Sequence, residues 1–197
     1  MQPFRVHTGR IAPLLRANVD TDQIIPKQFL KRIERTGFGE FLFHDWRKAQ
    51  DGKPDPSFPL NDPRYAGASI LVAGKNFGCG SSREHAVWAL EDFGFRAVVA
   101  PSFADIFANN CAQNGVLTVI LSEEEVTEIA RRAAEVPTYQ LTIDLEQRRV
   151  TDDRGMNSTF PLDESTRHRL LNGLDDIGLT LQYEGEIGAY EDSHRTL

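Results

Sequence analysis

Short apolar runs alternate with amphipathic stretches through the middle of the chain, and this alternation limits the fold more than any other feature. Three of the runs are typical of buried strands, at residues 69–73, 97–100 and 116–121. Apolar residues recur at helical spacing after the first run, at Ala86, Val87, Leu90 and Phe93. Strands that alternate with helices in this way predict an α/β fold with a parallel sheet and crossover helices.

Capping and turn residues predict where further elements begin or end. Ser122 stands three positions before Glu125, and Ser102 stands three positions before Asp105. Both spacings resemble a capping box, so each serine is expected to open a helix. Near the amino terminus, short strands are expected around a turn at Thr8-Gly9.

The last third of the chain changes in character. Residues 141–145 alternate with period two, which predicts a strand that returns as a hairpin. Two helices are predicted after it, at residues 167–172 and 175–190. We expect a single domain over residues 1–197, with the helical segment at about 163–190 packed on it.

Composition and charge exclude several classes of function. The net charge is −7, and no basic cluster is longer than two or three residues, so nucleic acid is not an expected partner. The amino terminus lacks the apolar core of a signal peptide, and no apolar run is long enough to span a membrane. The two cysteines, Cys79 and Cys111, fit neither a disulfide framework nor a zinc site. These features predict a cytoplasmic protein with no membrane partner.

The loop between the first apolar run and its helix, residues 74–85, holds the residues best suited to chemistry. In open α/β folds, ligands bind at this carboxyl edge of the sheet. The first N–H groups of the following helix are unpaired, and its dipole adds roughly half a positive charge. The loop adds glycines that permit close approach, two hydroxyls and a guanidinium fork, at Gly78, Gly80, Ser81, Ser82 and Arg83. Such donors predict a site for an anion.

Two nucleotide-binding interpretations of this loop fail on their diagnostic residues. A phosphate-binding loop requires Gly-Lys before its serine, and a dinucleotide fingerprint starting at Gly78 requires glycine where Arg83 stands. A simpler alternative is that Ser81 or Ser82 merely caps the helix. The second glycine, Arg83 and the preceding strand together favour a carboxylate site over that alternative.

Two separated motifs resemble one known family. Residues 80–86, Gly-Ser-Ser-Arg-Glu-His-Ala, resemble the signature of the swivelling domain of the aconitase superfamily. Residues 18–26, Asn-Val-Asp-Thr-Asp-Gln-Ile-Ile-Pro, are similar to a motif of the small subunits of 3-isopropylmalate dehydratases, and Phe38-Gly39 and residues 43–46 continue it. The resemblance extends over residues 4–190. It implies an α/β fold of the aconitase type, a swivelling β/β/α domain with a central three-layer strand–helix unit.

The resemblance implies a role for each matching residue. Ser81, the first serine of the motif, is expected to act as the base that removes a proton alpha to a carboxylate. Ser82, Arg83 and Gly80 are expected to bind the substrate. Asp22 is expected to be an active-site carboxylate that orients a partner histidine or arginine, whereas its local sequence alone favours a turn-forming aspartate.

The segment from Pro26 to Phe38 departs from aconitase itself, in which the corresponding loop carries an arginine that reads a third carboxylate. Here Phe29, Leu30 and Ile33 alternate with basic residues. These three side chains would suit an isopropyl group, and we expect them to bind the substrate. They could equally pack on a partner subunit, and the sequence favours neither alternative. His85 lies one helical turn beyond Ser81 and could be its catalytic neighbour, but a supporting or core role is favoured.

The function implied by the resemblance is that of a hydro-lyase small subunit. The enzyme would interconvert 2-isopropylmalate and 3-isopropylmalate, both small dicarboxylates, through 2-isopropylmaleate in leucine biosynthesis. No metal or cofactor is expected on this chain, because two cysteines cannot assemble an iron–sulfur cluster. The resemblance places a [4Fe-4S] cluster on a large subunit, the expected partner in a heterodimer. The alternatives are a sister hydro-lyase, such as a homoaconitase or methylmaleate-type hydratase, and a non-catalytic anion-binding assembly module.

Overall fold

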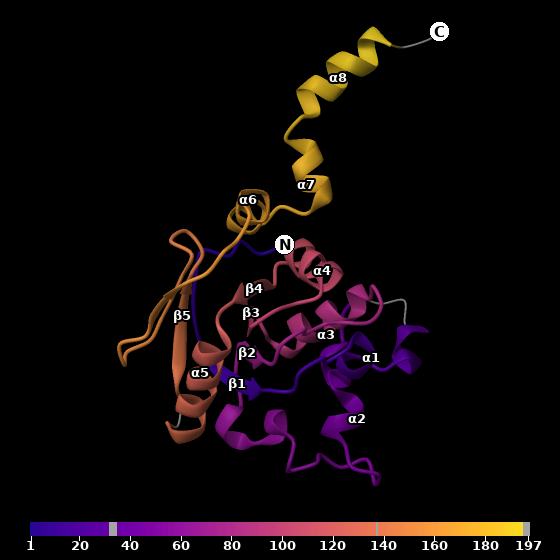
Figure 1. Ribbon diagram of the computed structural model, residues 1–197. Helices are drawn as coiled ribbons and strands as arrows, with labels where there is room; N and C mark the ends of the chain where they lie inside the picture. Colours follow the sequence, from indigo (N-terminus) through magenta and orange to yellow (C-terminus); the bar gives the residue numbers. More distant parts are fainter. Residues whose placement is uncertain (32–34, 137, 195–197) are drawn as a thin grey trace.

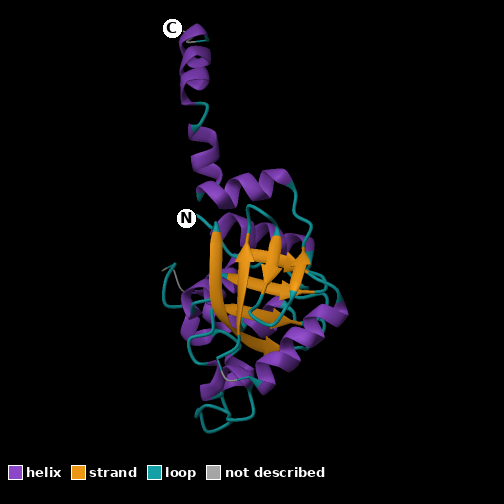
Figure 2. Cartoon of the chain, turned by 90° about the vertical axis from the view of Figure 1, so that its left-hand side faces the viewer, coloured by secondary structure: helices purple, strands orange, loops and turns teal. Residues whose placement is uncertain are grey.

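Seven strands form one mixed sheet in the computed structural model, which describes residues 1–31, 35–136 and 138–194. The order across the sheet is β4-β3-β2-β1-β5-β6-β7. Four neighbouring strands are parallel: β1 (Val6–Leu14), β2 (Ile70–Ala73), β3 (Ala97–Ala100) and β4 (Leu117–Ile120). The remaining strands are antiparallel: β5 (Gln140–Asp144), β6 (Arg149–Thr151) and β7 (Asn157–Thr159). Figure 2 shows that the sheet curls between its two halves.

Helices cover both faces of the parallel half of the sheet (Figure 1). The described α-helices are α1 (Thr21–Ile24), α2 (His44–Arg47), α3 (Glu84–Phe93), α4 (Asp105–Asn114), α5 (Glu123–Glu135), α6 (Glu164–Asn172), α7 (Asp176–Leu181) and α8 (Glu184–Ser193). Short 3₁₀ turns lie between β1 and β2, at η1 (Lys27–Lys31), η2 (Gly39–Phe41), η3 (Pro59–Asn61) and η4 (Pro63–Tyr65). α3 packs against α4 on one face, and α5 contacts β1, β2 and β3 on the other.

The side chains of β2 separate two apolar cores. Leu71 and Ala73 belong to the core under α3 and α4, whereas Ile70 and Val72 belong to the core under α5. Successive side chains of a strand point to opposite faces, so a strand covered on both sides is apolar throughout. The predicted α/β fold with alternating strands and helices is therefore confirmed.

Gly9 lies within β1, so the predicted turn at Thr8-Gly9 is wrong. The strand runs unbroken from Val6 to Leu14. A Cβ at position 9 would be 2.1 Å from Ser69 Oγ and 2.8 Å from His7 Nε2, so a larger residue would have to displace these two side chains. The predicted hairpin is confirmed, because β5 pairs with β6 in antiparallel register.

The two predicted capping boxes have different outcomes. Ser122 and Glu125 form one at the start of α5, as expected. The prediction for Ser102 is wrong, because the N-cap residue of α4 is Ala104 and no side chain caps this helix. The Ser102 Oγ instead accepts a hydrogen bond from the Asn76 N–H at 2.9 Å, which ties α4 to the loop after β2.

The carboxyl-terminal helices differ from their prediction in arrangement. α6 packs on the domain through the buried Leu170, whereas α7 and α8 extend away from it (Figure 1). The single helix predicted over 175–190 is divided at Gln182–Tyr183, and Asp176 at the start of α7 accepts hydrogen bonds from Gln113 of α4 and Arg169 of α6. Their large apolar side chains are exposed: Ile177, Leu181, Tyr183, Ile187 and Tyr190. None of the helices in the described ranges is long and apolar enough to cross a membrane.

Candidate functional site

The two sequence motifs lie side by side at the carboxyl edge of the parallel sheet. The loop from β2 to α3 meets the loop from β1 to α1, because β1 and β2 are parallel neighbours and both loops leave at the same edge. The Gly78 N–H donates to Val19 O at 2.8 Å, and the Thr21 N–H donates to Cys79 O at 2.9 Å. Segments that are distant in sequence therefore form one site.

A second neighbour holds the same loop from the other side. The Phe77 N–H donates to Ser102 O at 3.1 Å, and the Ala104 N–H donates to Phe77 O at 3.1 Å. Gly78 has a φ of 77°, and a Cβ there would be 2.1 Å from Phe107 Cγ. Position 78 therefore requires glycine for both its conformation and its packing.

α3 begins without a side-chain cap. Its N-cap residue is Arg83, so the alternative in which Ser81 or Ser82 caps the helix is wrong. Both serines are exposed, and neither hydroxyl forms a hydrogen bond with the part of the chain that the structure describes. The first N–H groups of α3 and its dipole favour an anion near these hydroxyls.

An ion pair between Arg83 and Asp22 joins the charged residues of the two motifs. Arg83 Nη1 contacts Asp22 Oδ1. The arginine side chain is 19% exposed, and the aspartate, in the first turn of α1, is 53% exposed. Of the two partners that the resemblance implies for Asp22, the structure places an arginine beside it. The ion pair places the guanidinium beside α1 at the start of α3, while the buried Nη1 forms no hydrogen bond with the described residues.

Thr21 is a site residue that the motif spacing does not single out. Its side chain is buried, and its Oγ1 donates to Ser81 O at 3.0 Å. Asp20 and Gln23 form a capping box at the start of α1, and their spacing is a signal that could have located this helix. Gly80 has a φ of 95°, and a Cβ there would be 3.4 Å from Thr21 Oγ1. α1 therefore orients the backbone that carries Ser81.

Two of the expected substrate-binding residues of the preceding segment, Phe29 and Leu30, lie on η1 and pack partly against the core. The Phe29 ring is stacked on Phe41 with centroids 4.1 Å apart, and its edge meets His44 at 4.9 Å. Leu30 is also partly buried against the core under α3. Ile33 lies outside the described residues. Phe29 is therefore an anchor for the segment, and only the exposed parts of Phe29 and Leu30 are open to a ligand.

His85 packs as a supporting ring, as expected. Its centroid is 5.4 Å from that of Phe38 and 4.6 Å from that of Trp88. Burial lowers the pKa of His85; the carboxylate of Glu84 opposes this shift, and the positive charge of Arg83 reinforces it. The ring is therefore neutral near pH 7.

Neither cysteine is activated as a thiolate. Burial raises the pKa of Cys79, to which the carboxylate of Asp20 also contributes, and burial raises the pKa of Cys111 strongly. Cys111 is 0% exposed in the core under α3 and α4. Within the described ranges, no cluster of three or more His, Cys, Asp or Glu side chains could hold a metal ion.

The start of α3 can bind a carboxylate. Exposed hydroxyls, unpaired helix N–H groups and an oriented guanidinium gather there on glycine-containing backbone. Each of these groups donates hydrogen bonds. The guanidinium carries a positive charge, and the N-terminal end of the helix carries a partial positive charge. The site is open to solvent on the side of the two serines.

Known proteins match this chain over nearly its whole length. Residues 1–124 match the aconitase C-terminal domain, and residues 176–196 match the C-terminal domain of the 3-isopropylmalate dehydratase small subunit. The 3-isopropylmalate dehydratase small subunit of Brevibacillus brevis is 62% identical over 191 residues, which cover 97% of this chain and 98% of that protein. The corresponding protein of Koribacter versatilis is 62% identical over 194 residues, which cover 98% and 100%.

A solved structure agrees with these matches. The crystal structure of 3-isopropylmalate dehydratase from Methanocaldococcus jannaschii superposes with a TM-score of 0.66 at 26% identity, covering 94% of this chain and 99% of that chain. The mixed, curled sheet is thus the fold of the aconitase C-terminal domain. The chain belongs to the family of 3-isopropylmalate dehydratase small subunits, which form part of a hydro-lyase of leucine biosynthesis.

Proposed function

We propose that this chain supplies the proton-abstracting half of a shared active site, with Ser81 as the base. The observation that carries the proposal is the exposed Ser81 hydroxyl at the start of α3, next to Arg83 and its partner Asp22. The proposed substrates, 2-isopropylmalate and 3-isopropylmalate, are dicarboxylates that interconvert through 2-isopropylmaleate. Forming that alkene requires removal of a proton alpha to a carboxylate.

Positive charge around Ser81 makes the hydroxyl usable as a base. A serine hydroxyl is a weak base at its ordinary pKa, so the site must stabilise the alkoxide form. The N-terminal end of α3 and the guanidinium of Arg83 are oriented before substrate arrives, which is the arrangement that stabilises oxyanions most effectively. Asp22 holds the guanidinium, and Ser82 and the backbone at Gly80 bind a substrate carboxylate.

The proposal includes a large subunit as partner, which the name of the relatives implies. Ser81 and Ser82 are exposed, whereas proton abstraction by an alkoxide requires a site from which water is excluded. The residues of this chain do not fit a [4Fe-4S] cluster, because Cys111 is buried and such a cluster needs three or four thiolates. We assign the cluster to the large subunit and the complex to the cytoplasm.

Specificity is assigned to residues 27–38, here called the side-group segment. The exposed parts of Phe29 and Leu30, with Ile33, would contact the isopropyl group. Leu30→Ala is the cleaner test, since Phe29 also anchors the segment through Phe41. The variant should raise KM for 3-isopropylmalate in the complex. An unchanged KM with weaker subunit association would instead assign this side chain to the subunit interface.

Ser81→Ala, assayed in complex with the large subunit, tests the assignment of the base. We expect kcat for 3-isopropylmalate to fall by about 10²- to 10⁴-fold, the range that general bases contribute. Ser82→Ala should mainly raise KM, because the substrate carboxylate loses one hydrogen bond. Size-exclusion chromatography should show unchanged association of both variants with the large subunit.

Ser165→Ala is the matched control, since this serine is exposed on α6. It should retain the kcat and KM of the unmodified complex. A Ser81→Ala complex that turns over at the unmodified rate would overturn the proposal. A complex that binds isopropylmalate but shows no turnover before any substitution would support the alternative of an anion-binding module.

A further inference from the structure

The end of the side-group segment is attached directly to α3, the helix whose start carries the serines. The Phe38 N–H donates to Asp92 Oδ2 at 2.8 Å. Gly39 follows and lies against the backbone of the same helical turn, where a Cβ would be 2.7 Å from Phe93 N and 2.8 Å from Asp92 C. Backbone atoms cannot move aside as a flexible side chain can, so this approach depends on glycine.

Aromatic packing reinforces the attachment. Phe38 is 0% exposed, and its ring lies edge-on to His85 and 5.7 Å from the centroid of Trp88. His85, Trp88 and Asp92 lie three and four positions apart, so they share one face of α3. The Arg35 guanidinium lies 5.2 Å from the centroid of the Trp88 ring, on the same face. Arg35 and Phe38 of the segment thus both contact this face of α3.

The described parts of the segment are therefore held at two places, both of which connect to α3. Near its start, Phe29 is stacked on Phe41 of η2, and η2 itself packs against α3. At its end, Phe38 is hydrogen-bonded to the last turn of α3. α3 is one continuous helix from Glu84 to Phe93, so it transmits the position of this attachment to its own start.

We propose that Asp92 and Gly39 are positioning residues for substrate recognition, which set the place of the side-group segment relative to Ser81. Neither residue touches the reacting atoms. Loosening the attachment shifts Phe41 and the Phe29 ring stacked on it, while the base and its charges stay in place. The proposal rests on the proposed role of the side-group segment, and it concerns KM rather than kcat.

Asp92→Ala and Asp92→Asn, each in complex with the large subunit, test this role. Alanine removes the acceptor for the Phe38 N–H, and we expect KM for 3-isopropylmalate to rise about tenfold, as for a lost charge-assisted hydrogen bond. The kcat should stay near that of the unmodified complex. Asparagine keeps a carbonyl oxygen that can accept the bond, so Asp92→Asn should restore most of the lost affinity. A variant that was only less stable would lose active enzyme without this split.

Asp163→Ala is the matched control, because Asp163 accepts a backbone N–H from Thr166 at the same distance, 2.8 Å, at the start of α6. It should lower thermal stability and leave KM unchanged. Gly39→Ala is a second perturbation that keeps the carboxylate, and it should also raise KM. An unchanged KM in Asp92→Ala and Gly39→Ala, or an equal rise in the alanine and asparagine variants, would overturn the proposal.

Leu30→Ala separates this proposal from the one on which it rests. A raised KM in Leu30→Ala with an unchanged KM in Asp92→Ala would refute the positioning role of Asp92. It would leave the role of the side-group segment intact. An unchanged KM in Leu30→Ala would remove the role of the side-group segment, whatever Asp92→Ala does. The assignment of Ser81 is tested by kcat and is independent of both results.

Discussion

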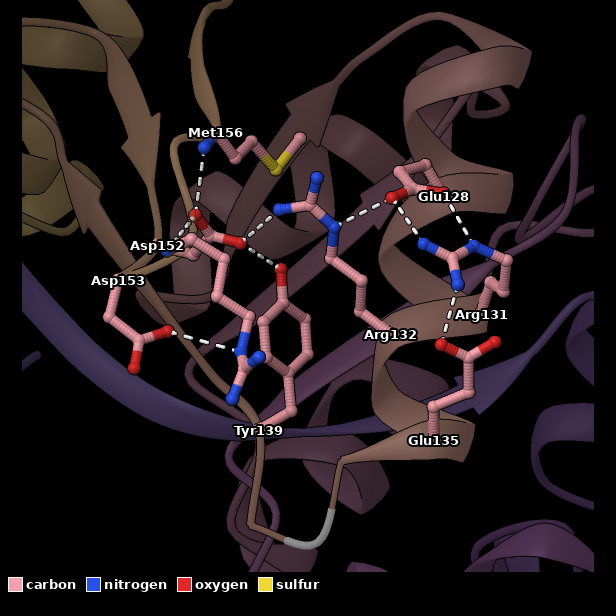
Figure 3. Close-up of polar contacts among 9 residues, drawn as sticks. Glu128, Arg131, Arg132, Glu135, Tyr139, Asp152, Asp153 and Met156 are labelled. Atoms are coloured by element: carbon pink, nitrogen blue, oxygen red, sulfur yellow. Dashed lines mark hydrogen bonds and ion pairs between the residues drawn. The ribbon is translucent and has the colours of Figure 1, made fainter.

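Asp152 is the centre of a buried polar network that joins α5 to the turn after β6 (Figure 3). Its side chain is 0% exposed. It accepts hydrogen bonds from Arg132 Nη1 and Tyr139 Oη, both at 2.5 Å, and from the N–H groups of Arg154 and Met156, both at 2.8 Å. We predict that Asp152→Asn destabilises the fold, because an amide has one acceptor oxygen and no charge.

The size of the effect follows from the pKa of the carboxyl. Burial by itself would raise the pKa of Asp152, but the hydrogen bonds from Tyr139, Met156, Arg154 and Arg132 outweigh it and lower the pKa from 3.8 to about 2. The folded-state pKa is thus depressed, so the charge stabilises the fold above pH 3.8 and the contribution is lost as pH falls through about 2. This contribution is about 2 kcal/mol at pH 7 and about 1 kcal/mol at pH 3.

Urea unfolding of the isolated chain at pH 7 and pH 3 measures both quantities. The amide also leaves one hydrogen-bond donor unsatisfied, which adds about 1 kcal/mol to the loss. Asp152→Asn should therefore lower the free energy of unfolding by about 3 kcal/mol at pH 7 and by about 2 kcal/mol at pH 3. Asp153→Asn is the control, because that side chain is 81% exposed and its ion pair with Arg154 spans 3.6 Å. A cost for Asp152→Asn no larger than that of the control, or one that grows as the pH falls, would refute the reasoning.

Two further predictions concern the loop of the site and the carboxyl-terminal helices. Gly78→Ala should destabilise the chain by at least about 2 kcal/mol, because alanine must adopt a positive φ and its Cβ overlaps Phe107. Thermal melts should show a smaller loss of stability when the same substitution is made in a Phe107→Ala background. An equal loss in that background would contradict the steric argument. Removal of residues 175–197 should change the free energy of unfolding by no more than about 1 kcal/mol, because the described part of this region contributes exposed ion pairs and hydrogen bonds such as that of Asp176 with Arg169. A much lower Tm would show that these helices stabilise the domain.

The parts of the fold that could be predicted are those determined by neighbours in sequence. β2 is buried on both faces, so its residues read as a continuous apolar run, and Ser122 finds its capping partner within one helical turn. The predictions at Gly9 and Ser102 fail because each residue lies against a distant segment, beside Ser69 in one case and Asn76 in the other. The spacing of residues along the chain does not predict such long-range contacts.

The same division applies to the site. The loop with Ser81 was predictable, because a glycine-rich connection between strand and helix is a local pattern. The roles of Thr21 and Asp92 were not, since each acts on a residue of another segment, through the Ser81 carbonyl and the Phe38 N–H. The resemblance supplied an arginine or histidine for Asp22, but only the packing of α1 against the loop places Arg83 there.

The position of β1 has a consequence for the order in which the molecule can be completed. β1 is synthesised first, yet it lies between β2, which it meets in parallel register at Ile11 and Ile70, and β5, which it meets in antiparallel register at Val6 and Asp144. Phe4 adds a hydrogen bond to Leu170, farther still along the chain. Such nonlocal pairings are slow to form, because the entropy cost of closing a long loop comes before the stabilising contacts are made. During translation, β1 therefore stays without one neighbour until Asp144 has left the ribosome, and the backbone of its first half, residues 6–10, remains an unpaired edge throughout that interval.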